Sequence, residues 1–375
     1  MGARTESLRV YMSRPCWNER GGPTGHLPFL IDGLDARPDV SLVTFVYGSR
    51  RFAGVPRWLS DSLPGRVATV AWDLSRFLGL VLRRGRPDVL HLNSSYEPWA
   101  VLRDLPYLLA GRALGFAVIV KTHGSDEAFV GNTAPLWRLI KGLHRRLATV
   151  MTLLSPVETE QFREAHPGER GTFRTGKNIV KAAPMPAAAR EPGNVLFAGR
   201  LVEKKDVPTL LRALEVLGAE RSDLSLTVAG VGPLEPELRG LAEELGVADR
   251  IRWAGWLPRP ELRRLVASTS AVAFTSTGSE GMPMVVIESL AAGVRLVSTP
   301  VRFVRSHGLD GMGVAVVEAG DVHGLAAALR DALDAPSLDP QELTERERFL
   351  GGFRQDVVVD EFVELYREAR CSRGA

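Results

Sequence analysis

FTSTGSEGMPMVVIESLAAG, residues Phe274–Gly293, is the stretch that indicates the fold of this chain. An apolar run ends at Thr275–Ser276, and a loop with glycines follows. A helical pattern then begins near Pro283, where proline is favoured, and Gly293 follows it in the position of a C-terminal cap. A strand, a short loop and a helix in this order are typical of one unit of a parallel α/β sheet.

The same alternation of short apolar runs and longer helical patterns extends outward in both directions. Runs such as VLFAG and AVAFTS are apolar nearly throughout, as expected for strands that are covered on both faces. Helical patterns lie between most of the runs, for example at Pro98–Leu114 and Leu136–Ala148. The expected strands are Leu8–Met12, Val40–Val46, Val67–Trp72, Asp88–Asn93, Ala117–Thr122, Val150–Leu154, Asn194–Ala198, Leu224–Ala229, Ile251–Ala254, Ala271–Ser276, Arg295–Thr299 and Val314–Val317.

A proline-rich interruption divides this pattern into two complete series. KAAPMPAAAREPG, residues 181–193, cannot continue a helix or a central strand, and it reads as a linker or as a long surface loop. We therefore expect two Rossmann-like, doubly wound domains, 1–180 and 194–348, facing a central cleft. Phe349–Arg370 predicts an amphipathic helix within a terminal segment, 349–375, and packing back onto the first domain is one alternative for it.

Composition excludes several classes of protein. The 375 residues are 45% hydrophobic and 24% charged, which excludes disorder as the dominant state. A balance of 47 basic against 44 acidic residues argues against a nucleic-acid binder, and two distant cysteines exclude a disulfide scaffold. The sequence has no apolar run of transmembrane length and no secretory signal pattern at its N-terminus. We expect a cytoplasmic protein that meets anionic small molecules or an anionic membrane surface.

The glycine loop before the second-half helix carries the first candidate site. Free N–H groups and the helix dipole at a helix N-terminus favour an anion. Glu280 lies in the loop, and Glu288 lies on an otherwise apolar helix. A buried carboxylate is costly unless it is hydrogen-bonded, and the two hydroxyls of a ribose would supply donors. From the residues alone, a solvated Glu280 and a merely structural Glu288 remain equally good readings.

Two further candidates follow strands of the second half. FAGRLVEKKDVPTLL places Arg200 and Lys205 across a turn, just before a helix that begins near Val207–Pro208, which suits a diphosphate. VAGVGPL places Gly230 and Gly232 after a strand, where the backbone can approach a flat ligand closely. A solvated turn and an ordinary strand-to-helix turn are the alternatives.

Two candidates lie in the first half of the chain. RGGPTGH, Arg20–His26, places Gly22 in a tight turn after the first expected strand. VKTHGSD, Val120–Asp126, places His123 just past the end of another expected strand, where a histidine can reach a ligand. The alternatives are an ordinary glycine turn and a histidine that only forms structural hydrogen bonds.

Together these motifs resemble those of a retaining glycosyltransferase of glycosyltransferase family 4, which has the GT-B fold. The marker is the pair of glutamates in Glu280-GMPMVVI-Glu288, followed by SLAAG. GRLVEKK, AGVGPLEPEL, RIRWAGWLP and the N-terminal GG loop match in the family's order, so the resemblance covers nearly the whole chain. It implies a nucleotide-diphosphate sugar as donor and a glycan, a lipid-linked molecule or a small molecule as acceptor.

The resemblance also implies roles for the charged residues. Arg200 and Lys205 would bind the donor diphosphate and neutralise the charge of the leaving group. Glu288 would bind the ribose hydroxyls, and Glu280 would contact the hydroxyls of the donor sugar. No metal or other cofactor is implied, because the two cations would serve in place of a metal.

Further roles fall on backbone groups and on one histidine. The N–H groups of Gly281, Met282 and Met284 would assist at the sugar, and Gly230 would lie against the nucleotide sugar. Gly22 would approach the diphosphate. His123 would face the sugar near the reacting carbon. The implied reaction is a front-face displacement through an oxocarbenium-like state, in which the leaving diphosphate takes the acceptor proton.

Three segments depart from the family pattern, and the last of them, Arg302–Arg305, leaves the donor sugar open. Asp206 and Lys177–Asn178 replace residues that are usually glycine and Asn-Gly. Arg302-Phe-Val-Arg305 replaces a usual Gly-Gly turn. A catalytically weak nucleotide-sugar-binding subunit and a GT-B epimerase-like enzyme therefore remain alternatives.

A basic, amphipathic helix is expected over Leu136–Leu147, and it suits peripheral contact with the inner face of a membrane. Its basic side holds Arg138, Lys141 and Arg145, and its apolar side holds Trp137, Ile140, Leu143 and Leu147. An ordinary surface helix with these apolar residues packed inward is the alternative.

Overall fold

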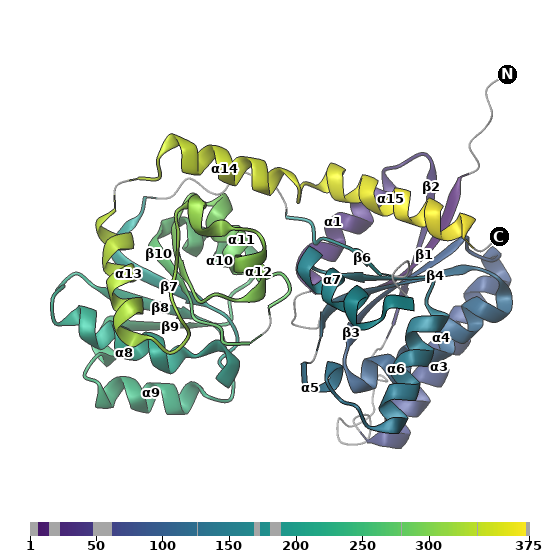
Figure 1. Cartoon of the computed structure of the whole chain (residues 1–375), viewed down its shortest axis with the longest axis horizontal. Coiled ribbons are helices and arrows are strands. Elements are labelled where there is room, and N and C mark those ends of the chain that lie inside the picture. Colours follow the sequence, from purple (N-terminus) through teal and green to yellow (C-terminus); the bar gives the residue numbers. More distant parts are fainter. Residues whose placement is uncertain are drawn as a thin grey trace. The chain divides into compact units, whose positions relative to one another are not determined.

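The structure is a computed structural model, and it describes residues 7–14, 23–47, 62–125, 127–168, 173–180, 189–278, 280–335 and 337–372. The chain forms two compact units. Unit 1 comprises Met1–Lys181 and Gln355–Ala375, and unit 2 comprises Ala182–Arg354. Each unit is a layered α/β structure with helices on both faces of one sheet (Figure 1).

Unit 1 is built on a parallel sheet with the order β2-β1-β3-β4-β5-β6 among the described residues. Because the first strand lies inside the sheet, the chain winds outward in both directions, which is the arrangement of a doubly wound fold. The strands are β1 (Leu8–Arg14), β2 (Val40–Val46), β3 (Val89–Tyr96), β4 (Ala117–Ser125), β5 (Val150–Leu153) and β6 (Phe173–Thr175).

The helices of unit 1 cover the two faces of this sheet. Helices α1 (Pro23–Asp35) and α15 (Gln355–Cys371) pack into one apolar cluster with β1, β3 and β4. Helices α3 (Leu63–Arg84), α4 (Pro98–Leu114) and α6 (Pro135–Leu147) pack into the cluster on the opposite face, together with the short α5 (Glu127–Val130) and α7 (Pro156–Ala165). The last helix of the chain therefore completes unit 1, and Figure 1 shows it beside α1.

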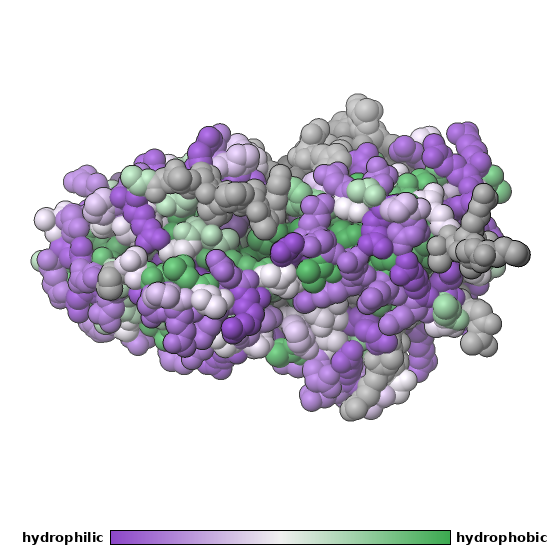
Figure 2. Space-filling model, turned by 90° about the horizontal axis from the view of Figure 1, so that it is seen from above, coloured by the Kyte–Doolittle hydropathy of each residue, from purple (hydrophilic) through white to green (hydrophobic). Residues whose placement is uncertain are grey.

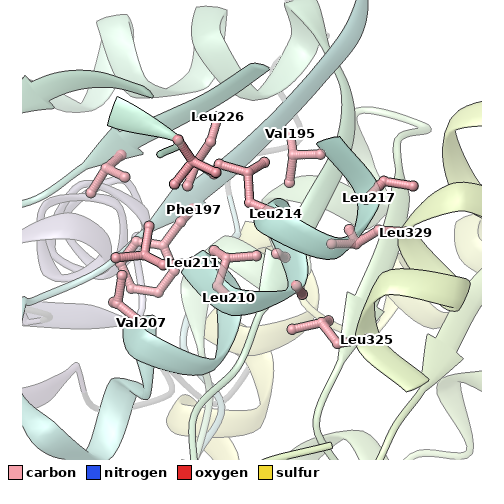
Figure 3. Close-up of a cluster of buried hydrophobic side chains, with 14 of the residues drawn as sticks. Val195, Phe197, Val207, Leu210, Leu211, Leu214, Leu217, Leu226, Leu325 and Leu329 are labelled. Carbon is pink, nitrogen blue, oxygen red and sulfur yellow. The ribbon is translucent and has the colours of Figure 1, made fainter. Parts of the chain in front are cut away.

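Unit 2 repeats this architecture, with the strand order β12-β11-β10-β7-β8-β9 and all described pairs parallel. Its core is an apolar cluster between the sheet and helices α8 and α13, to which Val195, Phe197 and Leu214 belong (Figure 3). Strands and helices alternate along unit 2. The strands are β7 (Glu191–Ala198), β8 (Ser225–Ala229), β9 (Ile251–Gly255), β10 (Thr269–Phe274), β11 (Arg295–Ser298) and β12 (Val314–Val316). The helices are α8 (Val207–Gly218), α9 (Glu235–Glu244), α10 (Arg259–Ser268), α11 (Met284–Ala291), α12 (Arg302–Ser306), α13 (Val322–Asp334) and α14 (Pro340–Gly351).

The structure contradicts one expected strand, Val67–Trp72, which lies inside helix α3. Ser62 begins this helix, because its side chain accepts a hydrogen bond from the Gly65 N–H. The buried residues then recur every four positions, which is the helical period and not the alternation of a strand. These residues are Thr69, Asp73, Phe77 and Val81.

Two smaller expectations also need correction. The sixth strand of the first sheet is β6, a segment of three residues that is too short to show a sequence pattern. The helix expected over Phe349–Arg370 is interrupted, because α14 ends at Gly351 and α15 begins at Gln355. The Gly351–Gly352 pair explains this break, since glycine is a poor helix former. The described surface seen from above is mainly hydrophilic, with smaller apolar areas (Figure 2).

Candidate functional site

The two strongest sequence motifs of unit 2 meet in one ion pair. Lys205 Nζ lies 2.7 Å from Glu280 Oε1, although the residues are 75 positions apart in sequence. Both side chains are largely buried, with 13% and 16% of their surface exposed. The ammonium group of Lys205 also lies 4.9 Å from the centre of the Phe274 ring. A cation and a carboxylate are thus held together where strands β7 and β10 end.

Hydrogen bonds from the loop after β10 fix the turn that carries Lys205. This turn is the short helix η2 (Glu203–Lys205), which follows β7. The Thr275 hydroxyl donates to the Lys205 carbonyl (2.8 Å), and the Ser276 hydroxyl lies 2.9 Å from the Lys204 carbonyl and 3.0 Å from Glu280 Oε1. The two loops therefore form one structure, and the sequence indicated each of them separately.

Arg200 also follows the carboxyl end of β7, but it does not join the ion pair of Lys205 and Glu280. It follows β7, its side chain is exposed, and it forms no ion pair with another described residue. An exposed guanidinium near the carboxyl end of a central strand is available to an anionic ligand. The structure thus brings Lys205 and Glu280 together and leaves Arg200 uncommitted among the described side chains.

Gly230 and Gly232 are required by the packing of two backbone segments. A Cβ atom on Gly230 would lie 1.8 Å from the Gly199 carbonyl oxygen, and one on Gly232 would lie 2.1 Å from that of Leu201. The Gly199 N–H donates to the Ala229 carbonyl, and the Leu201 N–H donates to the Val231 carbonyl. Close backbone packing therefore accounts for this glycine motif, and contact of Gly230 with a ligand stays a prediction.

Glu288 is buried on α11 and has a cationic partner that the motifs did not indicate. Its carboxylate lies 3.0 Å from Arg259 Nη2, and only 5% of its side chain is exposed. Burial raises the pKa of Glu288, and the guanidinium groups of Arg259 and Arg263 lower it. One oxygen of the carboxylate is thus neutralised by Arg259, which begins α10 after the RIRWAGWLP segment. A ribose would find a carboxylate that is already oriented.

The backbone groups that the resemblance singled out lie at the start of α11, where Gly281 and Met282 precede the helix and Met284 is its first residue. The helix begins at Met284 after Pro283, and no side chain caps it. The first N–H groups of a helix have no partner within the helix, so this end suits a polar or anionic ligand. Met282 is buried and Gly281 is half-buried.

The opposite end of α11 is held by a buried arginine. The Arg346 guanidinium donates to the carbonyls of Ser289, Leu290 and Val294 at distances of 3.1–3.4 Å. Burial lowers the pKa of Arg346 to about 10. Because cations stabilise the C-terminal end of a helix, this contact helps to fix the position of Glu288 on the same helix.

His123 lies in unit 1, near the end of β4, and not in the loop beyond it. Its Nε2 atom is 3.0 Å from Asn93 Oδ1, and its ring centre is 4.9 Å from that of His26. Burial lowers the pKa of His123 well below 6.5, as do the charges of His26, Lys121 and His91. Gly22, the other candidate of the first half, lies outside the described residues.

The segment Arg302–Arg305, which departs from the family pattern, forms the short helix α12 directly after β11. Phe303 is fully buried, and its ring centre lies 4.4 Å from that of His307. Arg305 is exposed and lies 3.5 Å from Glu318. The buried apolar residues Phe303 and Val304 thus pack inside unit 2, which explains why they stand here; the structure does not explain the two arginines.

Helix α6 differs from the expected pattern in the residues that it exposes. Lys141, expected on a basic surface, is buried and donates to the carbonyls of Phe129, Val130 and Asn132. Leu143, expected to pack inward, is 42% exposed. The physical reason is that the carbonyls of Phe129, Val130 and Asn132 converge at the end of α5, and a lysine ammonium can donate to all three.

Sequence reasoning missed the three polar side chains that hold the candidates in place. Arg259 belongs to a polar helix start, Ser276 to a strand end, and Asn93 to the HLNSS run of β3. Ser276 lies within the motif FTSTGSEG and Arg259 directly follows the motif RIRWAGWLP, so both could have been considered as candidate site residues. Their partners could not, because each contact joins segments that are distant in sequence.

Two kinds of feature are absent from the described residues: a cluster of metal ligands and a membrane-spanning helix. No group of three or more His, Cys, Asp or Glu side chains in this part of the chain is arranged to hold a metal ion. None of the helices in the described ranges combines the length and apolar character needed to cross a bilayer.

Comparison with protein families yields two matches that divide the chain between them. Residues 21–174 match the glycosyl transferase 4-like domain, and residues 185–348 match glycosyl transferases group 1. The lipopolysaccharide core biosynthesis glycosyltransferase LpsE of Rhizobium meliloti is 32% identical over 177 residues, 46% of this chain and 48% of the relative. A D-inositol 3-phosphate glycosyltransferase of Streptomyces coelicolor is 29% identical over 69% of this chain and 58% of the relative. The chain spans about half the length of the curated relatives it matches.

Solved structures show the same fold over the whole chain. The lipopolysaccharide outer core galactosyltransferase WaaB superposes with a TM-score of 0.67 at 17% identity, over 98% of this chain and 99% of that chain. The Anabaena protein HepE, solved with UDP-glucose, superposes with a TM-score of 0.73 at 13% identity, over 96% of this chain and 100% of that chain. The chain therefore has the GT-B fold, with the two sequence domains of GT-B glycosyltransferases.

Proposed function

We propose that this protein is a retaining glycosyltransferase of family 4 that moves a sugar from a nucleotide-diphosphate sugar to an acceptor. The observation that carries the proposal is the ion pair between Lys205 and Glu280 at the carboxyl edge of the unit 2 sheet. Ligands of open α/β sheets bind at this edge. The two family domains and the UDP-glucose in the HepE structure support a donor of this class.

Donor binding would exchange the partners within this ion pair. In the structure, Lys205 is neutralised by Glu280. A diphosphate carries more charge than one carboxylate, so it would draw the ammonium of Lys205 and the exposed guanidinium of Arg200 to itself. Glu280 would then be free to accept hydrogen bonds from the sugar hydroxyls, assisted by the N–H groups of Gly281, Met282 and Met284.

The residues would contribute to the reaction mainly through fixed charges. Lys205 and Arg200 would stabilise the leaving diphosphate, which takes the acceptor proton. Glu280 would stabilise the positive charge that develops at the anomeric carbon, and Glu288 would hold the ribose. These cations meet the charge of the diphosphate, so the proposed reaction needs no metal ion.

Glutamine substitutions of the two glutamates test these roles. Glu280→Gln should lower kcat more than it changes donor KM, because its charge acts in the transition state. Glu288→Gln should mainly raise donor KM. The assay is release of UDP from UDP-glucose and of GDP from GDP-mannose, with melting curves of each variant. If both variants have lowered melting temperatures but keep wild-type kinetics at low temperature, the two glutamates are structural, and the protein shares only the fold of these enzymes.

Two other functions can be distinguished from this one by measuring what happens to the sugar donor when no acceptor is present. A catalytically weak nucleotide-sugar-binding subunit would be stabilised by nucleotides but would not hydrolyse a donor. An epimerase-like enzyme would convert the sugar without transferring it. A thermal-shift series with UDP, GDP, ADP and CDP identifies the nucleotide first, because a ligand stabilises the folded state by RT ln(1 + [L]/Kd).

We also infer that the enzyme works at the inner face of a membrane, on a glycan or lipid-linked acceptor, and a small-molecule acceptor is the alternative. Leucines 136, 139 and 143 are exposed along one side of α6, with exposed fractions of 64%, 69% and 42%. Arg138 and Arg146 are exposed on the same helix. Apolar side chains flanked by arginines suit an anionic lipid surface, where each basic residue contributes about 1 kcal/mol.

Vesicle sedimentation tests this surface. Binding should be strong to vesicles of phosphatidylcholine with phosphatidylglycerol, weak to phosphatidylcholine alone, and weaker at high salt. Leu139→Gln should reduce binding several-fold, whereas Leu343→Gln, at an exposed leucine of α14 in unit 2, should not. Equal binding by both variants and the wild type would exclude α6 as the contact.

A further inference from the structure

Three neighbouring strands of unit 1 bring together the side chains that surround His123. Strands β1, β3 and β4 are adjacent in the sheet (Figure 1). Ser13, Asn93 and His123 lie in the second half of these strands, toward their carboxyl ends. Ser13 is fully buried, and Asn93 is 9% exposed. Hydrogen bonds at such a buried place restrict which polar atoms can face each other.

Contacts with Ser13 fix the orientation of the Asn93 amide. Asn93 Nδ2 lies 2.7 Å from the backbone carbonyl oxygen of Ser13, and this oxygen can only accept a hydrogen bond. The nitrogen of the amide must therefore face Ser13. The Asn93 backbone N–H donates to the Ser13 hydroxyl at 2.7 Å, which holds the two strand ends in register.

The orientation of the amide in turn fixes the proton on His123. With Nδ2 directed at Ser13, the atom 3.0 Å from His123 Nε2 is the amide oxygen Oδ1, which can only accept. Nε2 must therefore carry the hydrogen. In a neutral imidazole the other nitrogen, Nδ1, then has a lone pair. Nδ1 is buried and has no hydrogen-bond partner among the described residues.

The surroundings of His123 keep the ring neutral. His26 on α1, Lys121 on β4 and His91 on β3 are the groups whose charges act on it, and each is basic. Burial is the main factor that opposes a positive charge on His123, and any charge on these basic neighbours would oppose it further. His123 therefore offers an acceptor nitrogen at Nδ1, while the hydrogen on Nε2 is directed at Asn93 Oδ1.

We propose that Asn93 is a positioning residue that holds His123 with its hydrogen on Nε2, so that Nδ1 accepts a hydrogen bond from a hydroxyl of the donor sugar. The role toward the sugar rests on the proposed function, whereas the state of the ring does not. A neutral acceptor suits a site where positive charge develops on the sugar, because an imidazolium there would oppose that charge. His123 then binds and orients the sugar and does not act as an acid.

The state of the ring can be measured on the unmodified protein without any substrate. Long-range ¹H–¹⁵N correlation spectra of protein with ¹⁵N-labelled histidine distinguish the two neutral forms and the imidazolium. The signal of His123 is assigned by its loss in His123→Ala. We expect hydrogen on Nε2 and a bare Nδ1 from pH 8 down to about pH 5.5, below the ordinary histidine pKa. Hydrogen on Nδ1, or an imidazolium at neutral pH, would overturn the proposal.

A double-mutant cycle tests whether Asn93 acts through His123. His123→Ala should lower kcat/KM for UDP-glucose or GDP-mannose turnover about tenfold, the effect of losing one hydrogen bond to the substrate. Asn93→Leu should lower it about three- to tenfold, and the double variant should lose no more than His123→Ala alone. Ser94→Ala is the control, because the neighbouring Ser94 hydroxyl bonds to Asp104 at 2.6 Å and not to His123.

The two measurements fail in different ways. If the effects of Asn93→Leu and His123→Ala add, as those of Ser94→Ala and His123→Ala should, the positioning role of Asn93 is wrong. If His123→Ala leaves turnover unchanged while the spectra show the expected ring, the contact between His123 and the sugar is wrong, and the roles proposed for Lys205, Glu280 and Glu288 are unaffected.

Discussion

The two units share one architecture but differ in where they keep their ionisable groups. In unit 1, two central strands bury His91 and Lys121 inside the sheet, in addition to buried ionisable residues on helices such as Asp104 and His144. In the described part of unit 2, the buried ionisable residues are Glu288 and Arg346, and both lie on helices. The core of unit 2 beside α8 is wholly apolar (Figure 3). Unit 2 therefore keeps ionisable groups out of its described strand cores and places them in loops and on helices around an apolar core.

This difference has a chemical counterpart at the carboxyl edges of the two sheets. Unit 2 presents full charges, on Lys205 and Glu280, that a diphosphate and a developing cation can meet. Unit 1 presents the His123 ring, which its surroundings keep neutral. Lys205 and Glu280 offset each other's charge in a largely buried ion pair, whereas the His123 ring stays neutral and is oriented by one hydrogen bond to Asn93. The division suggests that unit 2 binds by charge and unit 1 by shape and hydrogen bonds.

The largest expected effect concerns the backbone packing that supports the charged edge of unit 2. Gly230→Ala places a Cβ 1.8 Å from the Gly199 carbonyl oxygen, so two strand ends must separate. We expect a loss of about 3 kcal/mol in the free energy of unfolding of unit 2, the upper range for overpacking. Gly240→Ala is the control, because its Cβ meets nothing within 4 Å in α9, and it should gain about 0.5–1 kcal/mol. Urea unfolding measures the free energy of unfolding of both variants. If Gly230→Ala is as stable as the wild type, the packing argument is wrong.

The next effect tests whether unit 2 binds by charge. Lys205→Ala should weaken UDP or GDP binding by about 1.5–3 kcal/mol, because it removes a charge-assisted hydrogen bond. Binding of uridine or guanosine should change little. Lys204→Ala is the matched control, since Lys204 is the exposed neighbour with the same charge. Calorimetric titration gives each affinity, and an equal loss for nucleoside and diphosphate would refute the role of Lys205.

Much of this arrangement could be predicted from the sequence, because it depends on local patterns. The loop with Glu280, the turn with Lys205 and most strands follow from apolar runs and helix signals within about ten residues. The pairing of Glu288 with Arg259 and of His123 with Asn93 could not be predicted. Each joins two strand or helix ends that only the completed sheet brings together. The strand expected at Val67–Trp72 failed because β-branched residues in a long amphipathic helix resemble a strand in a short window.

Acid should separate the stabilities of the two units. Burial lowers the pKa of His91 to about 3, against 6.5 in the unfolded chain. Between these values the unfolded state binds the proton and the folded state does not, so His91 costs stability as the pH falls below about 6.5. The expected slope is about 1.4 kcal/mol per pH unit from this residue. In unit 1, the lowered pKa of His123 adds to this slope, whereas Asp104, whose pKa burial raises to about 6, opposes it below that pH, as the raised pKa of Glu288 does in unit 2.

Hydrogen exchange followed by mass spectrometry can resolve this effect, because it reports each unit separately. The opening free energy of β3 and β4 should fall between pH 6.5 and pH 4.5, whereas that of β7 and β8 should not. His91→Gln should flatten the slope of β3 by about 1.4 kcal/mol per pH unit. A parallel decline in both units, unchanged by His91→Gln, would remove the distinction between the two cores.

The smallest expected effect lies at Asp206, between the turn of Lys205 and helix α8. Asp206 has φ 43° and ψ 48°, and it is the one residue other than glycine with a positive φ in the described ranges. Asp206→Gly removes the strain of the Cβ but loses a negative charge at the start of α8 and adds freedom to the unfolded chain. We expect these terms to cancel to within about 0.5 kcal/mol. Asp206→Asn, which tolerates the left-handed region without the charge, should fall in the same range, whereas Asp206→Ala should lose about 1 kcal/mol. Thermal unfolding of the three variants ranks them. If Asp206→Ala equals Asp206→Gly, backbone conformation does not decide this position, and the charge of Asp206 must be its reason.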